Sequence, residues 1–432
     1  MDIFLDAIGC RLNEAELESW AGDFRKHGHR IVNDAGDAQL MIFNTCAVTQ
    51  EAVRKSRQSI KKLHRGNPTA RLVVSGCYVS LDNEEEAAGL GVDLVVRNSD
   101  KDKLVKIAHE VLDLPVMPQI ATEPAGSALF ARNRQRAFIK IQDGCRYRCT
   151  FCIVTTARGE ERSRPVAEII DEINQQHAAG IQEVVLTGVH VGGYGSDNDS
   201  SLFALVKAIL ADTDVPRVRF ASVEPWDLPD GFFDLFSNPR LMPHMHLPVQ
   251  SGSDPVLRKM ARRCKTAEYR ALLADIRSAV PGFEVSTDII VGFPGETEED
   301  WQNTCAFTEE MGFSHVHIFS YSPRSGTKAA GLPGQLPGDI KKQRSRELHA
   351  IAAQSRREAL ARNRKREHRV LWEAGRIDPV KRVLNFSGYT ENYLRVHTQT
   401  ELSMDLESRV TGFQPRALSE DGSALLGEVI AD

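Results

Sequence analysis

The first 112 residues alternate short apolar runs with longer polar stretches of helical character. These segments follow one another in the order Ile3–Ile8, Asn13–His27, Leu40–Phe43, Gln50–Arg65, Leu72–Val74 and Val92–Val96. Short strands that are separated by helices are typical of a parallel sheet. We therefore expect residues 1–112 to form a parallel α/β domain.

This pattern breaks in residues 113–130. Pro115, Pro118, Pro124 and Gly126 lie close together there, without apolar periodicity. Because such clusters mark loops between structured segments, we predict an inter-domain linker.

Six strand candidates recur between helical segments after residue 131. They are Ala137–Gln142, Glu183–Thr187, Val218–Ser222, Met245–Val249, Glu284–Val291 and His315–Ser320. Six such units fit a partial (β/α)6 barrel, in which ligands bind at the carboxyl ends of the strands. A long helical stretch, Lys341–Arg369, follows, and we place this domain at residues 131–366.

The end of the chain changes to short strands and turns. The strand candidates are Val370–Glu373, Val380–Phe386, Tyr393–Thr398, Arg409–Gln414 and Leu425–Ile430. They predict a small β-barrel at residues 367–432.

The composition is that of a soluble globular protein, with 41% hydrophobic and 26% charged residues. No apolar run approaches the roughly 20 residues that cross a bilayer, and the N-terminus lacks the pattern of a secretory signal. We expect a cytoplasmic protein without a membrane span. Eight cysteines are too sparse for a disulfide scaffold, so metal binding becomes the first question.

Three cysteines follow the first strand of the predicted barrel at the spacing C-x3-C-x2-C. We call Cys145, Cys149 and Cys152 the central trio. Three thiolates can hold three irons of a cubane cluster and leave the fourth iron open to a ligand. A zinc site is the weaker alternative, because zinc sites more often pair C-x2-C elements and close all four positions.

Three more cysteines each follow an apolar strand of the N-terminal domain. We call Cys10, Cys46 and Cys77 the N-terminal trio. Since the carboxyl ends of parallel strands share one edge of a sheet, these thiols can converge. Gly9 and Gly76 let the backbone approach a bulky ligand. Three buried free thiols remain the alternative.

The two trios together resemble the methylthiotransferase family of radical S-adenosylmethionine (SAM) enzymes. Its members combine a three-cysteine N-terminal domain, a radical SAM barrel and a C-terminal TRAM domain, and the resemblance covers nearly the whole chain. It implies two 4Fe-4S clusters and SAM as cofactors. The cluster of the central trio would bind and cleave SAM, and the cluster of the N-terminal trio would carry the sulfur that is transferred.

Further segments at predicted strand ends resemble segments of this family, and Leu186–Val189 matches the place where radical SAM proteins bind the amino group of SAM. They include Leu186–Val189, Ser222–Pro225, His246–Ser253 and the turn Gly292–Thr297, although this turn by itself is equally an ordinary loop. The implied SAM-binding residues are Thr187, Gly188, Val189, Ser222, Glu224, Gln250, Ser251 and Asp288. His244 and His246 alternate on one strand, and we favour structural roles for them over a metal pair.

The charge is unevenly spread. The chain has a net charge of −5, but Lys341–Arg369 contains eleven Lys or Arg residues against three Glu. This face is suited to phosphate binding, and a solvated helix is the alternative. A second basic patch comprises Arg54, Lys55, Arg57, Lys61, Lys62 and Arg65. By contrast, residues 370–432 contain six basic and ten acidic residues, although Gly388–Val396 resembles the RNA-binding TRAM signature.

The segments Gly9–Asn13 and Asn44–Thr49 resemble the branch of the family that acts on tRNA threonylcarbamoyladenosine. The branch that modifies a ribosomal-protein aspartate usually has proline where this chain has Arg11. The resemblance implies a methylthio group added to C2 of N6-threonylcarbamoyladenosine at position 37 of tRNA, using two SAM molecules. The implied partners are the tRNA anticodon loop, an electron donor such as flavodoxin or ferredoxin, and a sulfur source.

Three alternatives stay open. In the first alternative, the substrate is isopentenyladenosine in tRNA. In the second, it is the ribosomal-protein aspartate, which the acidic C-terminal part mildly favours. The third alternative is a non-catalytic RNA-binding protein that has kept a structural cluster.

Overall fold

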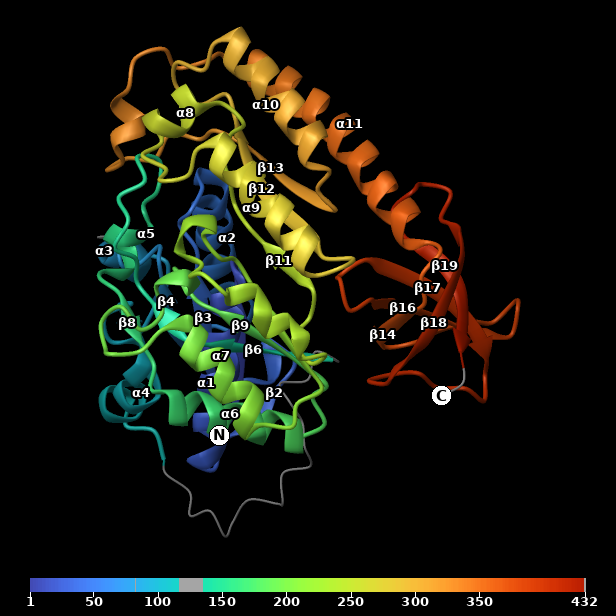
Figure 1. Cartoon of the computed structure of the whole chain (residues 1–432). Coiled ribbons are helices and arrows are strands. Elements are labelled where there is room, and N and C mark those ends of the chain that lie inside the picture. The colour runs from blue at the N-terminus through green and yellow to red at the C-terminus, as the bar shows by residue number, and fades with distance from the viewer. Residues whose placement is uncertain (82, 116–134, 431–432) are drawn as a thin grey trace.

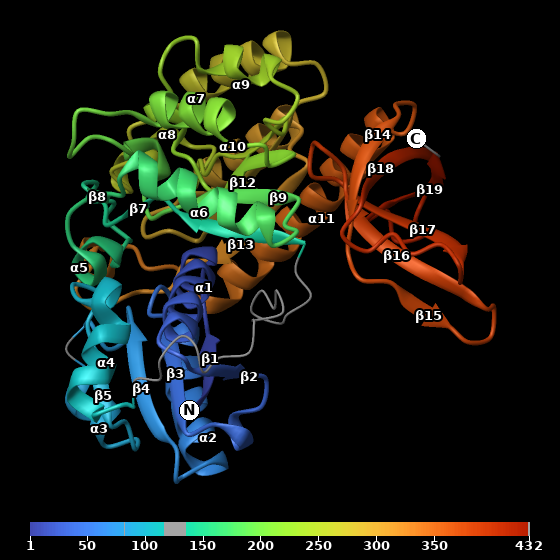
Figure 2. The same ribbon diagram turned by 90° about the horizontal axis from the view of Figure 1, so that it is seen from below.

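The computed structural model describes residues 1–81, 83–115 and 135–430. The N-terminal domain, coloured blue to cyan in Figure 1, is a five-stranded sheet, all parallel, in the order β2-β1-β3-β4-β5, and Figure 2 shows all five of its strands. Its strands are β1 (Asp2–Ala7), β2 (Arg30–Val32), β3 (Leu40–Thr45), β4 (Arg71–Gly76) and β5 (Leu94–Val96). Its helices are α1 (Arg11–Lys26), α2 (Gln50–Gly66), α3 (Glu84–Ala88) and α4 (Leu104–Leu112). The predicted parallel α/β domain is confirmed.

The central strand β3 is buried on both faces, which explains its continuous apolar sequence. Leu40 and Ile42 pack with the apolar side of α1 and α4, while Met41 and Phe43 pack on the opposite face with Ile60 of α2. The sheet is therefore held between two helical layers.

The middle domain contains six parallel strands in chain order, in two sheets of three, β6-β9-β10 and β11-β12-β13. The bridge between Ser222 and His246 joins the sheets. The strands are β6 (Arg136–Lys140), β9 (Glu183–Thr187), β10 (Arg217–Phe220), β11 (His244–His246), β12 (Glu284–Val291) and β13 (His315–Ser320). This arrangement confirms the partial barrel.

Helices cover the outside of this barrel, and shorter elements frame its mouth. The helices are α6 (Val166–Ala178), α7 (Leu202–Asp212), α8 (Asp254–Lys259), α9 (Thr266–Ala279) and α10 (Glu298–Met311). The short elements are β7 (Gln142–Asp143), α5 (Val154–Arg158) and β8 (Arg162–Ser163). Helix α1 of the N-terminal domain lies against the edge strand β6, so the two domains pack together along one side of the barrel (Figure 2).

The helix α11 (Gly338–Asn363) packs along β13 and α10 and leads into a C-terminal barrel. This helix ends before the predicted Arg369, because His368–Trp372 already forms strand β14. The other strands are β15 (Arg376–Asp378), β16 (Val383–Tyr389), β17 (Arg395–Glu401), β18 (Val410–Leu418) and β19 (Leu425–Ile430). The pairing of β14 with both β16 and β18 closes a five-stranded barrel, as predicted.

The C-terminal barrel is attached near the amino-terminal ends of the middle-domain strands. Arg217 and Arg219 at that end donate to the carbonyl oxygen of Thr390, at 2.9 and 3.5 Å, and both pair with the buried Glu183.

Among the described residues, none of the helices combines the length and the apolar character that crossing a membrane requires. The domain boundaries remain a prediction, and the predicted linker lies outside the described residues from position 116 onward.

Candidate metal centre at the strand ends

The N-terminal trio lies at the carboxyl ends of three neighbouring strands. Cys10, Cys46 and Cys77 follow β1, β3 and β4, which are adjacent in the sheet. Gly76 has φ +102°, and a Cβ atom there would lie 2.3 Å from the carbonyl oxygen of Thr45. Glycine is therefore required where these loops touch.

The thiols of the N-terminal trio are close enough to influence one another. Burial raises the pKa of Cys46 to about 11, and repulsion from the Cys77 and Cys10 thiolates adds to this rise. The Cys77 sulfur lies 3.7 Å from the Asn98 side-chain amide, which donates to it. The Cys46 thiol is therefore uncharged near neutral pH unless a cation compensates the charge of its thiolate, and bound iron would supply that cation. The donor set thus fits a metal cluster.

The central trio lies on the loop between β7 and α5. Burial raises the pKa of Cys145 to about 12 and that of Cys152 to about 11. Arg262 Nη1 lies 3.8 Å from the Cys149 sulfur, to which it donates. Gly144 has φ +75°, and a Cβ atom there would lie 1.9 Å from the carbonyl oxygen of Glu160, so only glycine fits at the start of this loop.

The two trios are close to each other. Asn98 Nδ2 lies 3.7 Å from the Cys77 sulfur and 2.7 Å from the carbonyl oxygen of Ala157 on α5, the helix that begins two residues after Cys152. All eight cysteines are free thiols. The structure therefore brings six of them to one region between the N-terminal sheet and the barrel.

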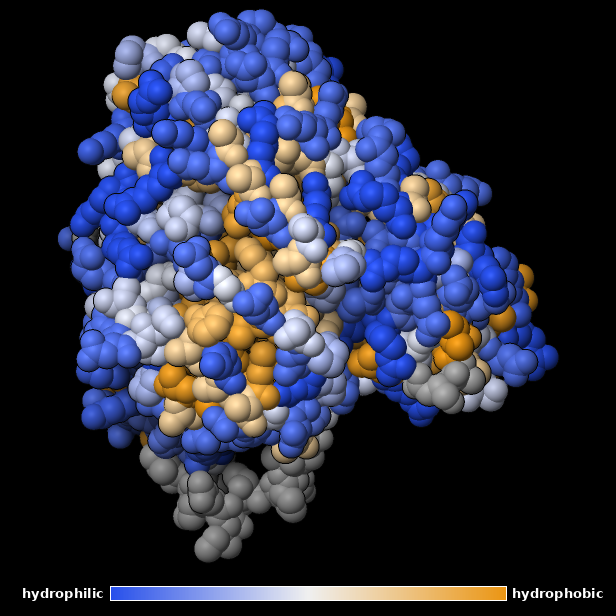
Figure 3. Space-filling model, viewed as in Figure 1, coloured by the Kyte–Doolittle hydropathy of each residue, from blue (hydrophilic) through white to orange (hydrophobic). Residues whose placement is uncertain are grey.

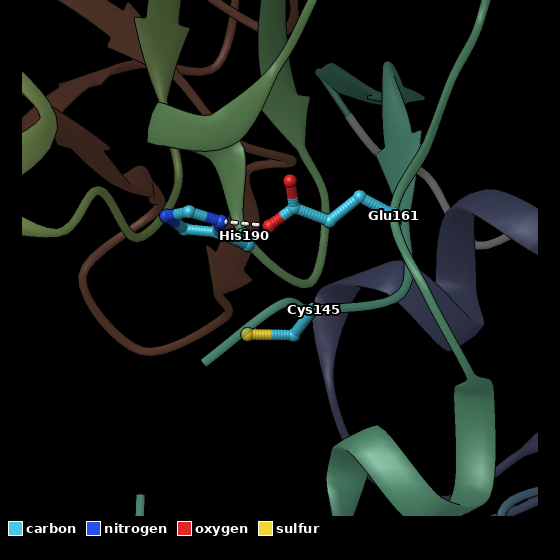
Figure 4. Close-up of side chains that lie close together, drawn as sticks. All are labelled: Cys145, Glu161 and His190. Atoms are coloured by element: carbon cyan, nitrogen blue, oxygen red, sulfur yellow. Dashed lines mark hydrogen bonds and ion pairs between the residues drawn. The ribbon is translucent and has the colours of Figure 1, made fainter. Parts of the chain in front are cut away.

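A buried histidine that the sequence reasoning missed lies beside Cys145 (Figure 4). His190 Nδ1 bonds Glu161 Oε1, and its Nε2 bonds Asp227 Oδ2 at 2.6 Å. Burial lowers the pKa of His190, but the hydrogen bond to Asp227, the charge of Glu224 and the hydrogen bond to Glu161 outweigh burial and raise the pKa overall.

Ligand atoms of Cys145, Glu161 and His190 lie within 4.8 Å of one another, which is close enough for a metal ion. However, both ring nitrogens of His190 are bonded to carboxylates, so neither offers a free lone pair. Tyr147, inside the cysteine loop, also donates to Asp227 at 2.6 Å. The histidine and its carboxylates therefore brace the loop of the central trio.

The predicted SAM-binding backbone lies at the end of β9. Val189 N and His190 N both donate to Gln142 Oε1, at 3.1 and 2.9 Å. The carbonyl oxygen of Thr187 accepts from Ile141 N at 2.9 Å. A Cβ atom on Gly188 would lie 3.0 Å from the same Gln142 oxygen, so this strand end is closely packed.

Glu224 lies beside the central trio. Its carboxylate is one of the charges that raise the pKa of Cys145. The buried Oε2 atom accepts no hydrogen bond from the described residues, although His190 Nε2 lies 3.6 Å away. Buried oxygens are rarely left without a partner, which suits a carboxylate that receives a ligand. Ser222, two residues earlier, bridges to β11.

The remaining SAM candidates follow β11 or lie on β12. Gln250 has φ +79°, an unusual conformation for a residue other than glycine. The buried Ser251 hydroxyl lies 3.3 Å from Thr304 Oγ1 on the outer helix α10. Asp288 Oδ1 lies 3.1 Å from His246 Nε2.

His244 and His246 are neighbours of the same serine. His244 Nε2 and His246 Nδ1 lie 3.1 and 3.0 Å from Ser286 Oγ on β12. His246 also forms, with Asp288 and His317, a group whose ligand atoms lie within 4.8 Å of one another. These side chains form a polar strip along β11, β12 and β13.

A basic groove lies between α11, the end of β13 and the start of α2. Its volume is ≈ 630 Å³, and none of its lining residues is acidic. Its basic side chains are Lys341, Lys342, Arg346 and His349. The second predicted basic patch, on α2, is partly neutralised, because Arg54 pairs with Glu51 and Arg57 pairs with Glu86.

Two sequence profiles match this chain. The profile of the Radical SAM superfamily matches residues 139–308, and that of the Uncharacterized protein family UPF0004 matches residues 2–97. The first match covers the end of β6, the four strands β9 to β12 and the central trio, and the second covers the N-terminal trio.

Several curated proteins are similar over most of their length. The "Threonylcarbamoyladenosine tRNA methylthiotransferase MtaB" of Thermotoga maritima is 37% identical, covering 90% of each chain. The protein of the same name from Bacillus subtilis is 34% identical, covering 90% of this chain and 88% of its own. A "tRNA-2-methylthio-N(6)-dimethylallyladenosine synthase" of Methylacidiphilum infernorum is 34% identical over 81% of this chain and 79% of its own.

Solved structures with the same fold share little sequence. The radical S-adenosylmethionine methyltransferase TsrM of Kitasatospora setae, with cobalamin and a [4Fe-4S] cluster bound, superposes with a TM-score of 0.56. It is 16% identical, and the superposition covers 76% of this chain and 77% of that one. This likeness concerns the fold alone.

Proposed function

Because the chain belongs to the methylthiotransferase family of radical SAM enzymes, we propose that it adds a methylthio group to C2 of N6-threonylcarbamoyladenosine at position 37 of tRNA. The proximity of the two cysteine trios is the observation that carries this proposal: Asn98 Nδ2 lies 3.7 Å from the Cys77 sulfur and donates to the carbonyl oxygen of Ala157, on the helix that follows Cys152, at 2.7 Å. The family uses SAM and two 4Fe-4S clusters. One trio for each cluster accounts for six of the eight cysteines.

The proposal assigns one cluster to Cys145, Cys149 and Cys152 and the other to Cys10, Cys46 and Cys77. Once bound, these cofactors supply one-electron cleavage of SAM and a transferable sulfur atom. Such chemistry is needed because C2 of adenine bears a C–H bond that no side-chain base removes near neutral pH.

The chain's own groups would bind and orient SAM. Glu224 offers a buried carboxylate oxygen beside Cys145. Gly188 directly follows β9, and Gln250 bridges to Ile289, the neighbour of Asp288 on β12. Carboxylates suit the ribose hydroxyls and the amino group of SAM, since both are hydrogen-bond donors.

The tRNA would approach along the basic groove. Lys342 and Arg346 are exposed on α11, and the visible face of this helix is mainly hydrophilic (Figure 3). Gln50 at the edge of the groove lies four residues after Cys46, so a phosphate chain in the groove passes close to the N-terminal trio. Phosphate contacts from Lys and Arg provide much of the affinity for nucleic acid.

Two substrate alternatives belong to the same family. Isopentenyladenosine in tRNA is favoured by the relatives named dimethylallyladenosine synthases, which are 34% identical to this chain. The ribosomal-protein aspartate remains the other alternative. Because the family consists of enzymes, the non-catalytic alternative loses its support.

The proposed reaction also requires an electron donor, a sulfur source and a compartment that contains tRNA. An external donor such as flavodoxin or ferredoxin would reduce the clusters, because SAM cleavage consumes an electron that no side chain here supplies. A separate sulfur source would replace the sulfur that leaves with each product. The cytoplasm, where tRNA is modified, would be the location.

Nucleoside mass spectrometry of tRNA from a deletion strain tests the substrate. We expect 2-methylthio-N6-threonylcarbamoyladenosine to disappear and to return with the wild-type gene. The Cys10→Ala and Cys145→Ala genes should each fail to restore it. If the modified nucleoside persists in the deletion strain, the proposal is wrong, and loss of the methylthio-isopentenyl nucleoside instead would identify the other tRNA substrate.

A further inference from the structure

The side chain of Arg158, at the end of α5, is buried between the N-terminal domain and the barrel. Its Nη1 donates to Glu16 Oε1 and to Asp143 Oδ1, both at 3.0 Å. Its Nη2 donates to Asn13 Oδ1 at 2.9 Å. Asn13 and Glu16 belong to α1, whereas Asp143 belongs to β7. One guanidinium therefore joins the two domains.

Asn13 carries this connection to two loops of the N-terminal trio. Its Nδ2 atom donates to the carbonyl oxygen of Ile8 at 2.7 Å and to that of Thr45 at 3.2 Å. These carbonyl groups lie directly before the loops that hold Cys10 and Cys46. A shift of Arg158 would thus be transmitted to both loops.

Asn98 makes the corresponding connection for the third loop. Its Nδ2 atom donates to the carbonyl oxygen of Ala157, the neighbour of Arg158, at 2.7 Å. The same atom lies 3.7 Å from the Cys77 sulfur. All three loops of the N-terminal trio are therefore linked to the end of α5, which begins two residues after Cys152.

Asp143 carries the connection to the loop of the central trio. Its Oδ1 atom accepts from Gly144 N at 2.8 Å, directly before Cys145. Its Oδ2 atom pairs with Lys140 at 3.0 Å. The guanidinium of Arg158 thus contacts groups that hold both cysteine sites.

Burying so many charges costs desolvation free energy, and buried ion pairs often add little net stability. A buried pair can instead select one arrangement of the groups that it joins. Only arginine presents five N–H donors in a planar fork, so lysine cannot contact three acceptors in this geometry.

We propose that Arg158 is a positioning residue that fixes the N-terminal trio relative to the central trio. This inference rests on the proposed function, because it assigns each trio one half of a two-step reaction. Its consequence is specific: loss of the Arg158 contacts should leave SAM cleavage intact and separate it from methylthio transfer.

Two variants test whether the contacts of Arg158 connect the two trios: one changes Arg158 itself, and the other changes its partner Asn13. Arg158→Lys keeps the positive charge but loses the fork. Asn13→Ala removes the connection to the N-terminal loops and leaves Arg158 paired with Glu16 and Asp143. Arg30→Lys is the control, since Arg30 makes a two-bond contact to Asp2, with both bonds at 2.7 Å, at the opposite end of the same sheet.

The discriminating measurement is the ratio of methylthio product to 5′-deoxyadenosine in the iron-loaded enzyme. We expect both variants to keep the iron content and the 5′-deoxyadenosine yield within twofold of wild type while the ratio falls at least tenfold. The electron paramagnetic resonance spectrum of the reduced protein should show altered interaction between the two clusters. The control should match wild type in all of these measurements.

A cofactor-free measurement adds an independent check. Hydrogen exchange of the cluster-free chain should become faster in the loops of the N-terminal trio in both variants, and in the loop of the central trio in Arg158→Lys. Unchanged ratios and spectra in both variants would overturn the proposal, as would a parallel loss of product and 5′-deoxyadenosine. If Arg158→Lys does not fold, Asn13→Ala decides alone. If wild type cleaves SAM but forms no methylthio product, the proposed function fails, while the spectra and hydrogen exchange still test the link.

Discussion

Gly9 lies directly against Cys46: a Cβ atom on Gly9 would lie 2.7 Å from the Cys46 Cβ atom and 2.9 Å from its sulfur. Gly9 also has φ +116°, a conformation that side chains disfavour. The Cys46 thiol thus occupies the volume that any side chain at position 9 would need.

Gly9→Ala should therefore displace Cys46 and weaken the N-terminal cluster. We expect iron to fall from roughly eight to roughly four atoms per chain after anaerobic reconstitution. 5′-Deoxyadenosine should still form, because the central trio is untouched. Gly22→Ala is the matched control, as Gly22 on α1 has no atom within 4 Å of its added carbon. Eight irons in Gly9→Ala would contradict the assignment.

Glu224→Gln should weaken SAM binding. A hydrogen bond to a charged group contributes about 1.5–3 kcal/mol, which corresponds to roughly 10- to 150-fold in affinity. Equilibrium binding of SAM to the iron-loaded protein measures the effect. The control is Glu310→Gln, which changes an exposed carboxylate paired with Arg270. Equal SAM affinity in wild type and Glu224→Gln would remove Glu224 from the site.

Charge reversal in the basic groove should weaken RNA binding without altering SAM cleavage. Lys342→Glu and Arg346→Glu should each lower the slope of log affinity against log salt by about 1, the effect of one lost phosphate contact. Binding of an anticodon stem-loop at several salt concentrations provides this slope. Lys207→Glu, on α7 outside the barrel, should bind like wild type. An unchanged slope in both groove variants would place the RNA elsewhere.

Glu16 should make the stability of the cluster-free chain depend on pH in the acid range. Burial raises the pKa of Glu16, but Arg158, Lys101 and Lys140 outweigh burial and lower the pKa from 4.5 to about 2. A lowered carboxyl pKa contributes stability above the unfolded value, and this contribution is lost as the pH falls from 4.5 toward 2.

Urea unfolding at pH 7, 5 and 3 measures this dependence. Glu16→Gln should cost about 3–5 kcal/mol at pH 7, because it leaves buried cations without their partner. The difference from wild type should shrink at pH 3. A difference that stays constant between pH 7 and 3 would assign the stability to packing rather than to charge.

The strands were predictable wherever burial on both faces makes the sequence continuously apolar. Strand β3 is the clearest case, since all its residues are buried. Strand β2 was not predicted, because Arg30–Val32 is too short and too exposed to show the alternation of apolar and polar residues that identifies a strand. The helix α11 was predicted too long, because the basic composition continues past its last residue, Asn363, into β14.

The cysteines were recognisable because their positions at strand ends can be read directly from the sequence. Arg158, His190 and Asp227 were not, since each is an ordinary residue in its own segment and gains its partners only from segments far along the chain. Ser251 shows a further limit of the sequence: its place after a strand was predictable, but the contact of its hydroxyl with Thr304 on α10 depends on packing, and its role in SAM binding stays a prediction.

The C-terminal barrel is attached at one end of the middle-domain strands, whereas both cysteine trios lie at the other. The helix α11 bridges this distance with 26 residues, which span about 39 Å at 1.5 Å per residue. A substrate that contacts both ends must therefore include the anticodon stem as well as its loop. Shortened oligonucleotides would measure the minimal RNA length that this enzyme requires.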